Sequence, residues 1–258
     1  MKRHAAVIGH PIAHSRSPEL FARFAASAGI ALTYRAVDIP PEALATTLDS
    51  WRNDAAFVGC NVTIPHKERA LALADEADEV ARGSGAANVL THDGRSLVAS
   101  NTDVEAIESA LRESGFDLHG ARVAILGSGG AARAVAYAAR RSGAKSIAIA
   151  ARNVERARAL AAAFDAHACA LDAIPAADLY VNATPVGMTG REQGSLLPSN
   201  AAAGAFAFDL VYTPIDTPFL HDARARGLHA MDGWRMFVAQ AAATFRRWFG
   251  VVPEVVEA

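Results

Sequence analysis

The segment Arg122–Arg133, which reads RVAILGSGGAAR, places a glycine-rich loop between a predicted strand and a predicted helix. Its first part, Val123–Leu126, is aliphatic without polar alternation, as is typical of a strand buried on both faces of a parallel sheet. The run Ala131–Arg141 then predicts a helix. In this context a glycine loop can bind phosphate, because the helix N-terminus offers unpaired N–H groups and a positive dipole. The alternative is an ordinary tight turn.

The loop approximates the fingerprint of dinucleotide-binding domains. Gly127 and Gly129 occupy the first two glycine positions, and Ala132 stands where a third glycine is usual. Alanine is small enough to let the helix pack closely on the strand. We therefore expect the cofactor phosphates to contact Gly127, Ser128, Gly129, Gly130 and Ala131.

A second predicted strand, Ser146–Ala150, indicates which dinucleotide is bound. NAD sites usually place an acid at the end of this strand to hold the ribose 2′-hydroxyl, whereas NADP sites place an arginine for the 2′-phosphate. Here the strand is followed by Ala151, Arg152 and Asn153, with Arg156 one helical turn further on. Guanidinium groups bind phosphate bidentately, so NADP is favoured over NAD. The alternative is a pair of solvated arginines on a surface helix.

Length and composition limit the class of protein. A chain of 258 residues is expected to form two domains, and 52% hydrophobic with 20% charged residues is a globular composition. The net charge of −2 gives no reason to expect nucleic acid or an anionic membrane as a partner. Cys60 and Cys169 lack metal-ligand spacing and are expected to be reduced core residues. Without a signal or membrane-spanning segment, the sequence predicts a cytoplasmic protein.

Strands and helices alternate along the chain, which indicates βαβ units and mostly parallel sheets. Further strands are predicted at Ala5–Gly9, Leu32–Ile39, Phe57–Val62, Leu179–Ala183 and Ala205–Leu210, and a hairpin or strand pair at Ala86–Leu90 and Ser96–Ala99. Further helices are predicted from Ser17-Pro18 to Gly29, from Pro40-Pro41 through Trp51, from Val104 to about Ser114, and from Met236 to Gly250.

Polar residues follow the predicted strand Phe57–Val62. Asn61 and Thr63 are two apart and would point the same way along an extended chain. Ligands of open α/β sheets bind at the carboxyl ends of strands. Lys67 then opens the next helical segment, where its charge opposes the helix dipole, which indicates a reason other than stability. The alternative is a solvated surface lysine.

Two polar residues have a structural interpretation as helix N-caps. Ser17 precedes Pro18 and is expected to cap the helix that follows, which leaves Ser15 unexplained. For Thr102 or Asp103, the structural alternative to a role in the site is the N-cap of the helix that begins near Val104.

The motifs together resemble the shikimate dehydrogenase family, in its order and at close to its spacing over nearly the whole chain. They are Ser15-x-Ser17, Asn61-x-Thr63-x-Pro65-x-Lys67, Asn88, Asn101-Thr102-Asp103, the glycine loop, Asn182-Ala-Thr184 and Asp232-Gly233 with Gln240. The resemblance implies two α/β domains with a cleft between them. One is a mainly parallel substrate-binding domain of residues 1–102 plus 234–258, and the other a Rossmann-type NADP domain of residues 103–233.

The implied reaction is the reversible NADP-dependent reduction of 3-dehydroshikimate to shikimate, in a monomer or homodimer. Lys67 is expected to handle the hydroxyl proton, with Asp103 binding the same hydroxyl and positioning the ammonium. The resemblance implies a substrate site of Ser15, Ser17, Asn61, Thr63, Lys67, Asn88, Asp103, Tyr212 and Gln240. It adds to the cofactor site Arg152, Asn153, Arg156, Thr184, Leu210 and Gly233.

The sequence departs from the family pattern at three places. Ala151 replaces an asparagine beside Arg152, Val104 replaces a glycine, and Trp234-Arg235 replaces Leu-Gly. Three alternatives therefore remain. They are a quinate/shikimate dehydrogenase, with either NADP or NAD as cofactor, a paralogue that acts on a different shikimate-like substrate, and a catalytically weak, metabolite-binding paralogue. A metal site is not expected, because His10, His14 and His66 lack further ligands at suitable spacing.

Overall fold

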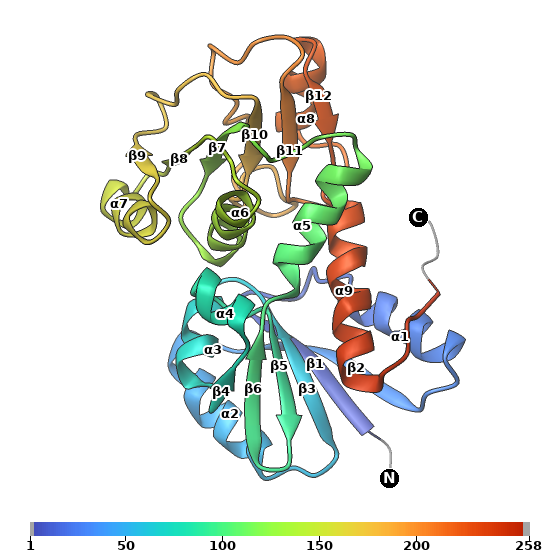
Figure 1. Ribbon diagram of the computed structural model, residues 1–258. Coiled ribbons are helices and arrows are strands. Elements are labelled where there is room, and N and C mark those ends of the chain that lie inside the picture. The colour runs from blue at the N-terminus through green and yellow to red at the C-terminus, as the bar shows by residue number, and fades with distance from the viewer. Residues whose placement is uncertain (1–2, 255–258) are drawn as a thin grey trace. The chain divides into compact units, whose positions relative to one another are not determined.

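The computed structural model describes residues 3–254, so the predicted domain ends at residues 1–2 and 255–258 lie outside the described residues. The chain divides into two compact units, Met1–Asp103 with Val238–Ala258 and Val104–Phe237. Each unit is built on its own six-stranded sheet with helices packed on it (Figure 1). The α/β class predicted from the sequence is confirmed.

The sheet of the first unit has the order β2-β1-β3-β5-β6-β4. β1 pairs in parallel with both β2 and β3, whereas β5 is antiparallel to β3 and β6. The predicted strand pair is therefore a true hairpin, and it makes this sheet mixed. The strands are β1 Arg3–Gly9, β2 Leu32–Asp38, β3 Phe57–Val62, β4 Glu76–Ala77, β5 Val89–Asp93 and β6 Ser96–Ser100.

The predicted helices of this unit appear in the expected order with shifted ends, and the structure adds one at Glu79–Ser84 that was not predicted. The helices of this unit are α1 Ser17–Ser27, a 3₁₀ turn at Pro41–Ala43 that leads into α2 Leu44–Arg52, α3 Lys67–Leu73, α4 Glu79–Ser84, and most of α9 Trp234–Phe249. Helix α1 ends before the predicted Gly29, because Gly29 adopts the left-handed conformation with φ of +65°.

The prediction that Ser17 caps α1 is wrong. Arg16 holds the N-cap position with helical dihedral angles and makes no side-chain cap bond. Instead, Oγ of Ser15 accepts the N–H of Ser17 at 3.3 Å. The serine that had no structural explanation in the sequence thus supplies the local hydrogen bond.

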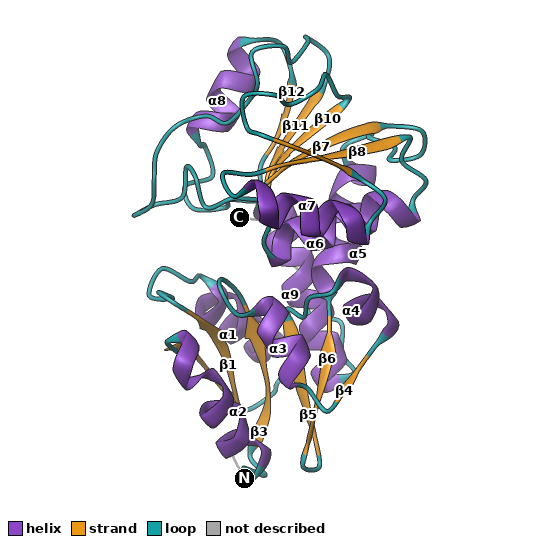
Figure 2. Ribbon diagram, turned by 90° about the vertical axis from the view of Figure 1, so that its left-hand side faces the viewer, coloured by secondary structure: helices purple, strands orange, loops and turns teal. Residues whose placement is uncertain are grey.

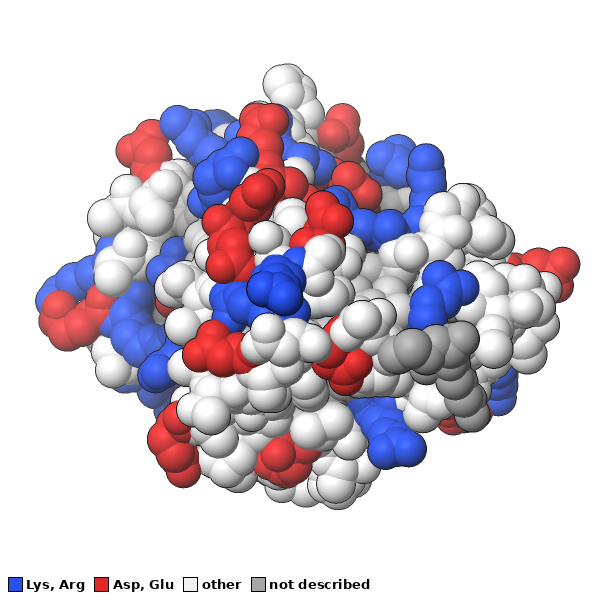
Figure 3. Space-filling model, turned by 90° about the horizontal axis from the view of Figure 1, so that it is seen from below, with Lys and Arg blue, Asp and Glu red and all other residues white. Residues whose placement is uncertain are grey.

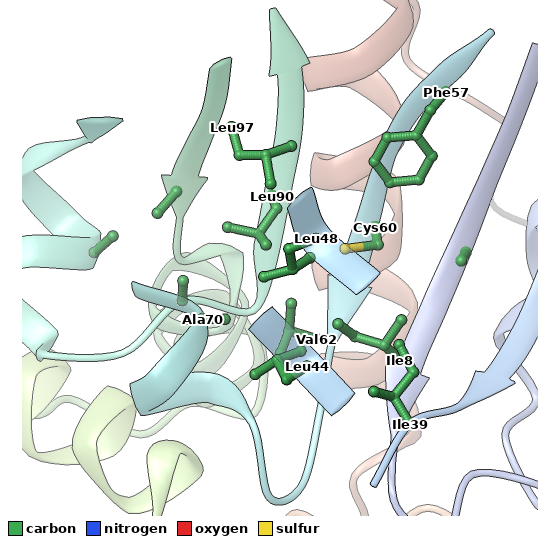
Figure 4. Close-up of a cluster of buried hydrophobic side chains, with 14 residues drawn as sticks. Ile8, Ile39, Leu44, Leu48, Phe57, Cys60, Val62, Ala70, Leu90 and Leu97 are labelled. Atoms are coloured by element: carbon green, nitrogen blue, oxygen red, sulfur yellow. The ribbon is translucent and has the colours of Figure 1, made fainter. Parts of the chain in front are cut away.

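Both faces of the first sheet are covered. On one face, Leu44 and Leu48 of α2 pack with strand residues that include Ile8, Val62 and Leu90 (Figure 4). The other face is aromatic: the ring of Phe21 from α1 stacks on Tyr34 at 4.1 Å, and the rings of Phe24 and Phe245 lie 5.7 Å apart. Aliphatic burial and aromatic packing together hold α1 and α9 on this sheet.

The second unit has an entirely parallel sheet of order β12-β11-β10-β7-β8-β9. Strand order reverses between β10 and β7, so α6 and α8 cover opposite faces of the sheet (Figure 2). Its strands are β7 Arg122–Leu126, β8 Ser146–Ala150, β9 His167–Cys169, β10 Leu179–Asn182, β11 Phe206–Asp209 and β12 His229–Met231. Its helices are α5 Thr102–Glu113, most of which lies in this unit, α6 Gly130–Arg141, α7 Val154–Ala163 and α8 Pro218–Ala225.

The reversal of strand order places a ligand site. In doubly wound sheets, ligands bind beyond the carboxyl ends of the strands where the order reverses. The glycine loop follows β7, one of the two strands at this point. The structure therefore gives the loop the strand–turn–helix context that the sequence predicts.

The surface carries both signs of charge. On the face that Figure 3 presents, acidic and basic side chains are interspersed among uncharged ones. Within residues 3–254, no helix combines the length and the apolar character that a bilayer span requires.

Candidate active site

The first unit brings Lys67 and Asp103 together from separate elements. Lys67 is the first residue of α3, the helix that follows β3, and Asp103 lies in the first turn of α5, the helix that follows β6. Nζ of Lys67 donates to Oδ2 of Asp103 at 2.5 Å. Their side chains are 13% and 4% exposed. Lys67 is enclosed and paired with a carboxylate, which excludes the alternative that it is a solvated surface lysine.

The structural alternative, in which Thr102 or Asp103 caps α5, does not hold. Oδ1 of Asn101 accepts the N–H of Asp103 at 3.1 Å, and Oδ1 of Asn88 accepts the N–H of Thr102 at 2.8 Å. Neighbouring amides therefore satisfy the start of the helix. The carboxylate of Asp103 is left to bind other side chains.

Asn88 holds the second oxygen of that carboxylate. The atom of its amide that faces the N–H of Thr102 must be the oxygen, so Nδ2 faces Asp103 and donates to Oδ1 at 2.8 Å. Nδ2 also lies 2.9 Å from Oγ1 of Thr102 and 3.3 Å from Oε1 of Gln240. Asn88, Asp103 and Gln240, predicted from separate motifs, thus meet in one network.

Asn61 belongs to the buried side of this network. Its Oδ1 accepts from the hydroxyl of Tyr34 at 2.8 Å, and its Nδ2 donates to Oγ1 of Thr244 at 3.1 Å. Oγ1 of Thr244 lies 3.4 Å from that of Thr102, which continues the chain of contacts toward Asn88. Neither Tyr34 nor Thr244 could be predicted as a member of the network from the sequence, because tyrosine in a strand and threonine in a helix are ordinary packing residues.

The segment that carries Ser15 and Ser17 is tied to β2. Oδ1 of Asp38 lies 2.5 Å from Nδ1 of His10, and its Oδ2 accepts the N–H of Ile12 at 3.3 Å. The hydrogen bond with His10 lowers the pKa of the Asp38 carboxyl. Ser17 is buried and Ser15 half-buried.

Thr63 lies beside the start of the same segment. A Cβ on Gly9 would come within 2.7 Å of Cγ2 of Thr63, so only glycine permits this approach. The N–H of His10 also donates to the carbonyl of Ile64 at 2.9 Å. Ser15, Ser17 and Thr63 are thus carried by two neighbouring strand ends, although no hydrogen bond joins these side chains to Lys67 among the contacts described.

In the second unit the glycine loop fits a bound phosphate. Gly127 adopts φ of +124°, and a Cβ there would lie 2.9 Å from the carbonyl oxygen of Ala183. Gly129 is the N-cap of α6 and has no side-chain cap bond. A Cβ at Gly129 would meet no atom within 4 Å. The helix N-terminus therefore opens onto space where an anion can approach its N–H groups.

The predicted adenosine-side residues follow β8. Oδ1 of Asn153 accepts the N–H of Arg156 at 3.0 Å and so caps α7. Nη1 of Arg152 donates to Oε2 of Glu192 at 2.9 Å. Sequence reasoning missed Glu192, since it lies 40 positions further along the chain.

The predicted nicotinamide-side residues follow β10. Oγ1 of Thr184 donates to Oδ1 of Asn182 at 2.7 Å, and Nδ2 of Asn182 donates to Oδ1 of Asp209 at 2.9 Å. Asp209 also accepts from the N–H of Val211 at 3.0 Å and from Oγ1 of Thr217 at 2.6 Å. Burial raises the pKa of Asp209 to about 6. The sequence analysis missed Asp209, for which the only signal is an acid at the end of a buried strand.

Gly233 and Leu210 lie against each other in the same unit. A Cβ at Gly233 would lie 2.8 Å from the carbonyl of Leu210, so this position requires glycine. The ring of Tyr212 stacks on Phe237 at 4.1 Å. Of the departures from the family pattern, Trp234 packs at 5.5 Å from the ring of Phe237, and Val104 is fully buried.

Two of the three histidines considered for a metal site, His10 and His66, make other contacts. His10 bonds Asp38, and a ring nitrogen of the buried His66 lies 2.7 Å from the carbonyl oxygen of Ile39. Across residues 3–254, no cluster of three or more His, Cys, Asp and Glu side chains could hold a metal ion.

Comparisons with known proteins agree with this arrangement. A family model described as the shikimate dehydrogenase substrate binding domain matches residues 7–90, and one described as shikimate/quinate 5-dehydrogenase matches residues 108–189. NADP(+) shikimate dehydrogenases from Nitrobacter hamburgensis and Sinorhizobium fredii are 44% and 42% identical to this chain. Each alignment covers 98% of this chain, and 90% and 92% of those relatives.

A solved structure extends the likeness to the fold. Shikimate 5-dehydrogenase from Thermus thermophilus, in complex with NADP(H) and shikimate, is 39% identical to this chain with a TM-score of 0.83. The match covers 98% of this chain and 95% of that one. Identity at this level over nearly the full length of both chains, together with both domain models, shows that the chain belongs to the shikimate dehydrogenase family.

Proposed function

We propose that this chain is an NADP-dependent shikimate dehydrogenase that interconverts 3-dehydroshikimate and shikimate. The observation that carries the proposal is the enclosed pair of Lys67 and Asp103, 2.5 Å apart and held by Asn88. Reduction of a carbonyl needs a proton donor beside the oxygen that becomes a hydroxyl, and oxidation needs an acceptor at the same place. One ammonium–carboxylate pair can serve both directions.

Lys67 is the proton donor in this mechanism. An ammonium group has three N–H donors, and one of them is committed to Asp103. A second can therefore point at the substrate oxygen. Bound NADPH would supply the hydride to the carbonyl carbon. Nζ of Lys67 gives its proton to the oxygen of that carbonyl, and the amine regains a proton from water. The oxidation direction reverses these transfers.

Asp103 is the residue that orients the ammonium. Its two oxygens are divided between Lys67 and Asn88, so its carboxylate cannot turn without breaking a hydrogen bond. Asn88 is itself fixed by the backbone of Thr102. This preorganisation lowers the cost of placing the proton donor at the moment of reaction.

Substrate recognition is assigned to polar side chains around this pair. Hydroxyls of Ser15 and Ser17 would bind the substrate carboxylate, and Thr63, Asn88, Asp103 and Gln240 the ring hydroxyls. Asn61, whose amide bonds Tyr34 and Thr244, would support this site, and Tyr212 of the second unit stays a prediction from the family resemblance. A site that hydrogen-bonds every hydroxyl rejects an analogue lacking one by on the order of 10⁴, because its buried polar groups are left unpaired.

The cofactor is assigned to the second unit. The glycine loop and the start of α6 would hold the pyrophosphate, and Arg152 with Arg156 the 2′-phosphate. Asn153, Thr184, Leu210 and Gly233 would line the rest of the dinucleotide. A cytoplasmic location and a monomeric or dimeric state stay predictions.

Steady-state rates test the proposal directly. Shikimate and quinate should each be assayed with NADP and with NAD, with quinate testing tolerance of a changed ring. We expect shikimate with NADP to give the highest kcat/KM. Binding of shikimate without formation of NADPH would instead favour a metabolite-binding paralogue.

A quinate/shikimate dehydrogenase is the second candidate. It is favoured by the match of residues 108–189 to a family model that covers both substrates. The bulky Trp234 and Arg235, in place of the family's Leu-Gly, also differ from a typical shikimate enzyme. A kcat/KM for quinate equal to that for shikimate would establish this alternative.

A further inference from the structure

Arg152 and Glu192 meet at the edge of the second sheet where the dinucleotide is expected. Arg152 follows β8, and Glu192 lies in the loop that follows β10. In the sheet order, β7 lies between these two strands, and β7 leads into the glycine loop. The 2.9 Å ion pair therefore joins segments from either side of the phosphate-binding loop.

The loop that carries Glu192 is folded back on itself. Gly187 adopts φ of +91°, and its N–H donates to the carbonyl of Glu192 at 2.8 Å. The N–H of Arg191 donates to the carbonyl of Met188 at 3.0 Å, and Nε2 of Gln193 donates to the same carbonyl at 2.9 Å. These bonds return the chain toward β10 and hold Glu192 where its carboxylate reaches Arg152.

The pair combines two opposite signals for ribose recognition. An acid accepts a hydrogen bond from the 2′-hydroxyl of NAD, whereas an arginine binds the 2′-phosphate of NADP. Sequence around β8 shows only the arginine, but the fold supplies an acid from a distant loop. An acid that favours NAD and an arginine that favours NADP therefore lie at the same position.

We propose that Glu192 is a specificity-determining residue that lowers the preference of this enzyme for NADP over NAD. The inference rests on the proposed function, in which Arg152 receives the 2′-phosphate. With NADP, the guanidinium must exchange the carboxylate of Glu192 for a phosphate, and the displaced carboxylate stays close to a second anion. With NAD, the carboxylate can stay on Arg152 and accept the 2′-hydroxyl.

The effect is moderate rather than absolute. The side chains of Arg152 and Glu192 are 75% and 58% exposed, so water and salt screen the pair. Exposed ion pairs contribute little, and their removal changes affinity by about two- to fivefold. Glu192 therefore shifts the balance between cofactors without blocking NADP.

Calorimetry with nucleotide fragments tests the inference without turnover. Adenosine 2′,5′-bisphosphate carries the 2′-phosphate, and 5′-AMP lacks it. Glu192→Gln should bind the bisphosphate about two- to fivefold more tightly than the wild type at low salt, and 5′-AMP no more tightly. The gain should shrink at high salt.

Matched variants separate this effect from a general change in charge. Asp165→Asn removes one negative charge from the same unit at an 86% exposed side chain that pairs with Arg140, and should leave both affinities unchanged. In an Arg152→Ala background, Glu192→Gln should lose most of its effect, because the shared partner is gone.

The outcomes distinguish the two proposals. If the wild type binds the bisphosphate more tightly than 5′-AMP but Glu192→Gln changes neither affinity, the role of Glu192 is overturned and the NADP assignment stands. If the wild type shows no preference for the bisphosphate, the NADP assignment fails together with the inference.

Discussion

Nζ of Lys67 lies 2.5 Å from Oδ2 of Asp103, although the two residues are 36 positions apart in the chain. The contact exists because α3 and α5 both begin where a strand of the first sheet ends. It also settles why a lysine opens a helix, since the carboxylate of Asp103 offsets its unfavourable interaction with the dipole.

Lys67→Ala should lower kcat by about 10²–10⁴ with a much smaller change in the KM for NADP, because it removes the proton donor. Steady-state kinetics measure the effect. The exposed Lys145 in the second unit provides the control, and Lys145→Ala should leave kcat unchanged. Weaker shikimate binding with full turnover would contradict the role. The melting temperature should be recorded for both variants, because Asp103 loses a partner.

Asp38→Ala should raise the KM for shikimate by about three- to tenfold and change kcat less, because the segment that carries Ser15 and Ser17 loses two anchoring hydrogen bonds. Initial rates over a range of shikimate concentrations measure this split. Asp54→Ala is a matched control, since Asp54 pairs with His4 at 2.8 Å and accepts the N–H of Ala56, near the opposite ends of β1 and β3. If the KM for shikimate rose equally in both variants, the change would reflect a loss of stability of the first unit and not the anchoring of the serine segment.

Arg152→Ala should raise the KM for NADP by about ten- to hundredfold, as expected for loss of a charge-assisted bond to phosphate. The KM for NAD should change little. Arg158→Ala is the control, because Arg158 is an exposed arginine of α7 that pairs with Glu155. If Arg152→Ala affected both cofactors equally, Arg152 would not contact the 2′-phosphate.

Asp209→Asn should flatten the pH dependence of stability between about pH 4 and 7. The pKa of Asp209 is raised from 3.8 to about 6 by burial, so the folded state binds the proton more tightly than the unfolded state. The resulting stability is fully present below pH 3.8 and is lost as the pH rises through about 6. The loss amounts to about 3 kcal/mol in total.

Denaturant unfolding at several pH values measures this effect. The free energy of unfolding of the wild type, relative to Asp209→Asn, should fall between pH 4 and pH 8. If the difference in free energy of unfolding between the two proteins stayed constant with pH, the pKa of Asp209 would not be raised in the folded state, or the loop at Val211 would open before Asp209 ionises.

Local patterns in the sequence were sufficient for the order and type of most elements. Val123–Leu126 and Ser146–Ala150 lie within one residue of the observed strands, and α3 begins at Lys67 as predicted. Aliphatic runs and glycine turns are properties of neighbouring residues, so they can be read without the fold. The short strands β4, β9 and β12 were missed, because two or three residues carry no such pattern, and the helices α4 and α8 were also not predicted.

The two helix caps considered from the sequence were placed at the wrong residues for a shared reason. At both α1 and α5, the accepting side chain lies two positions before the residue whose N–H it binds: Ser15 for Ser17, and Asn101 for Asp103. Several polar residues in a row can each serve as the acceptor. The local backbone geometry decides which of these side chains accepts the N–H, and that geometry cannot be predicted from the sequence alone.

The family, the glycine loop and the candidate catalytic residues could thus be inferred from motifs along the chain, because each motif is short and the order of motifs is itself specific. The partners of those residues could not. Asn88 meets Gln240 across 152 positions, and Arg152 meets Glu192 across 40. Such pairs form only when the tertiary structure brings distant helices, loops and strand ends together, so which side chains share a hydrogen bond is a property of the folded chain.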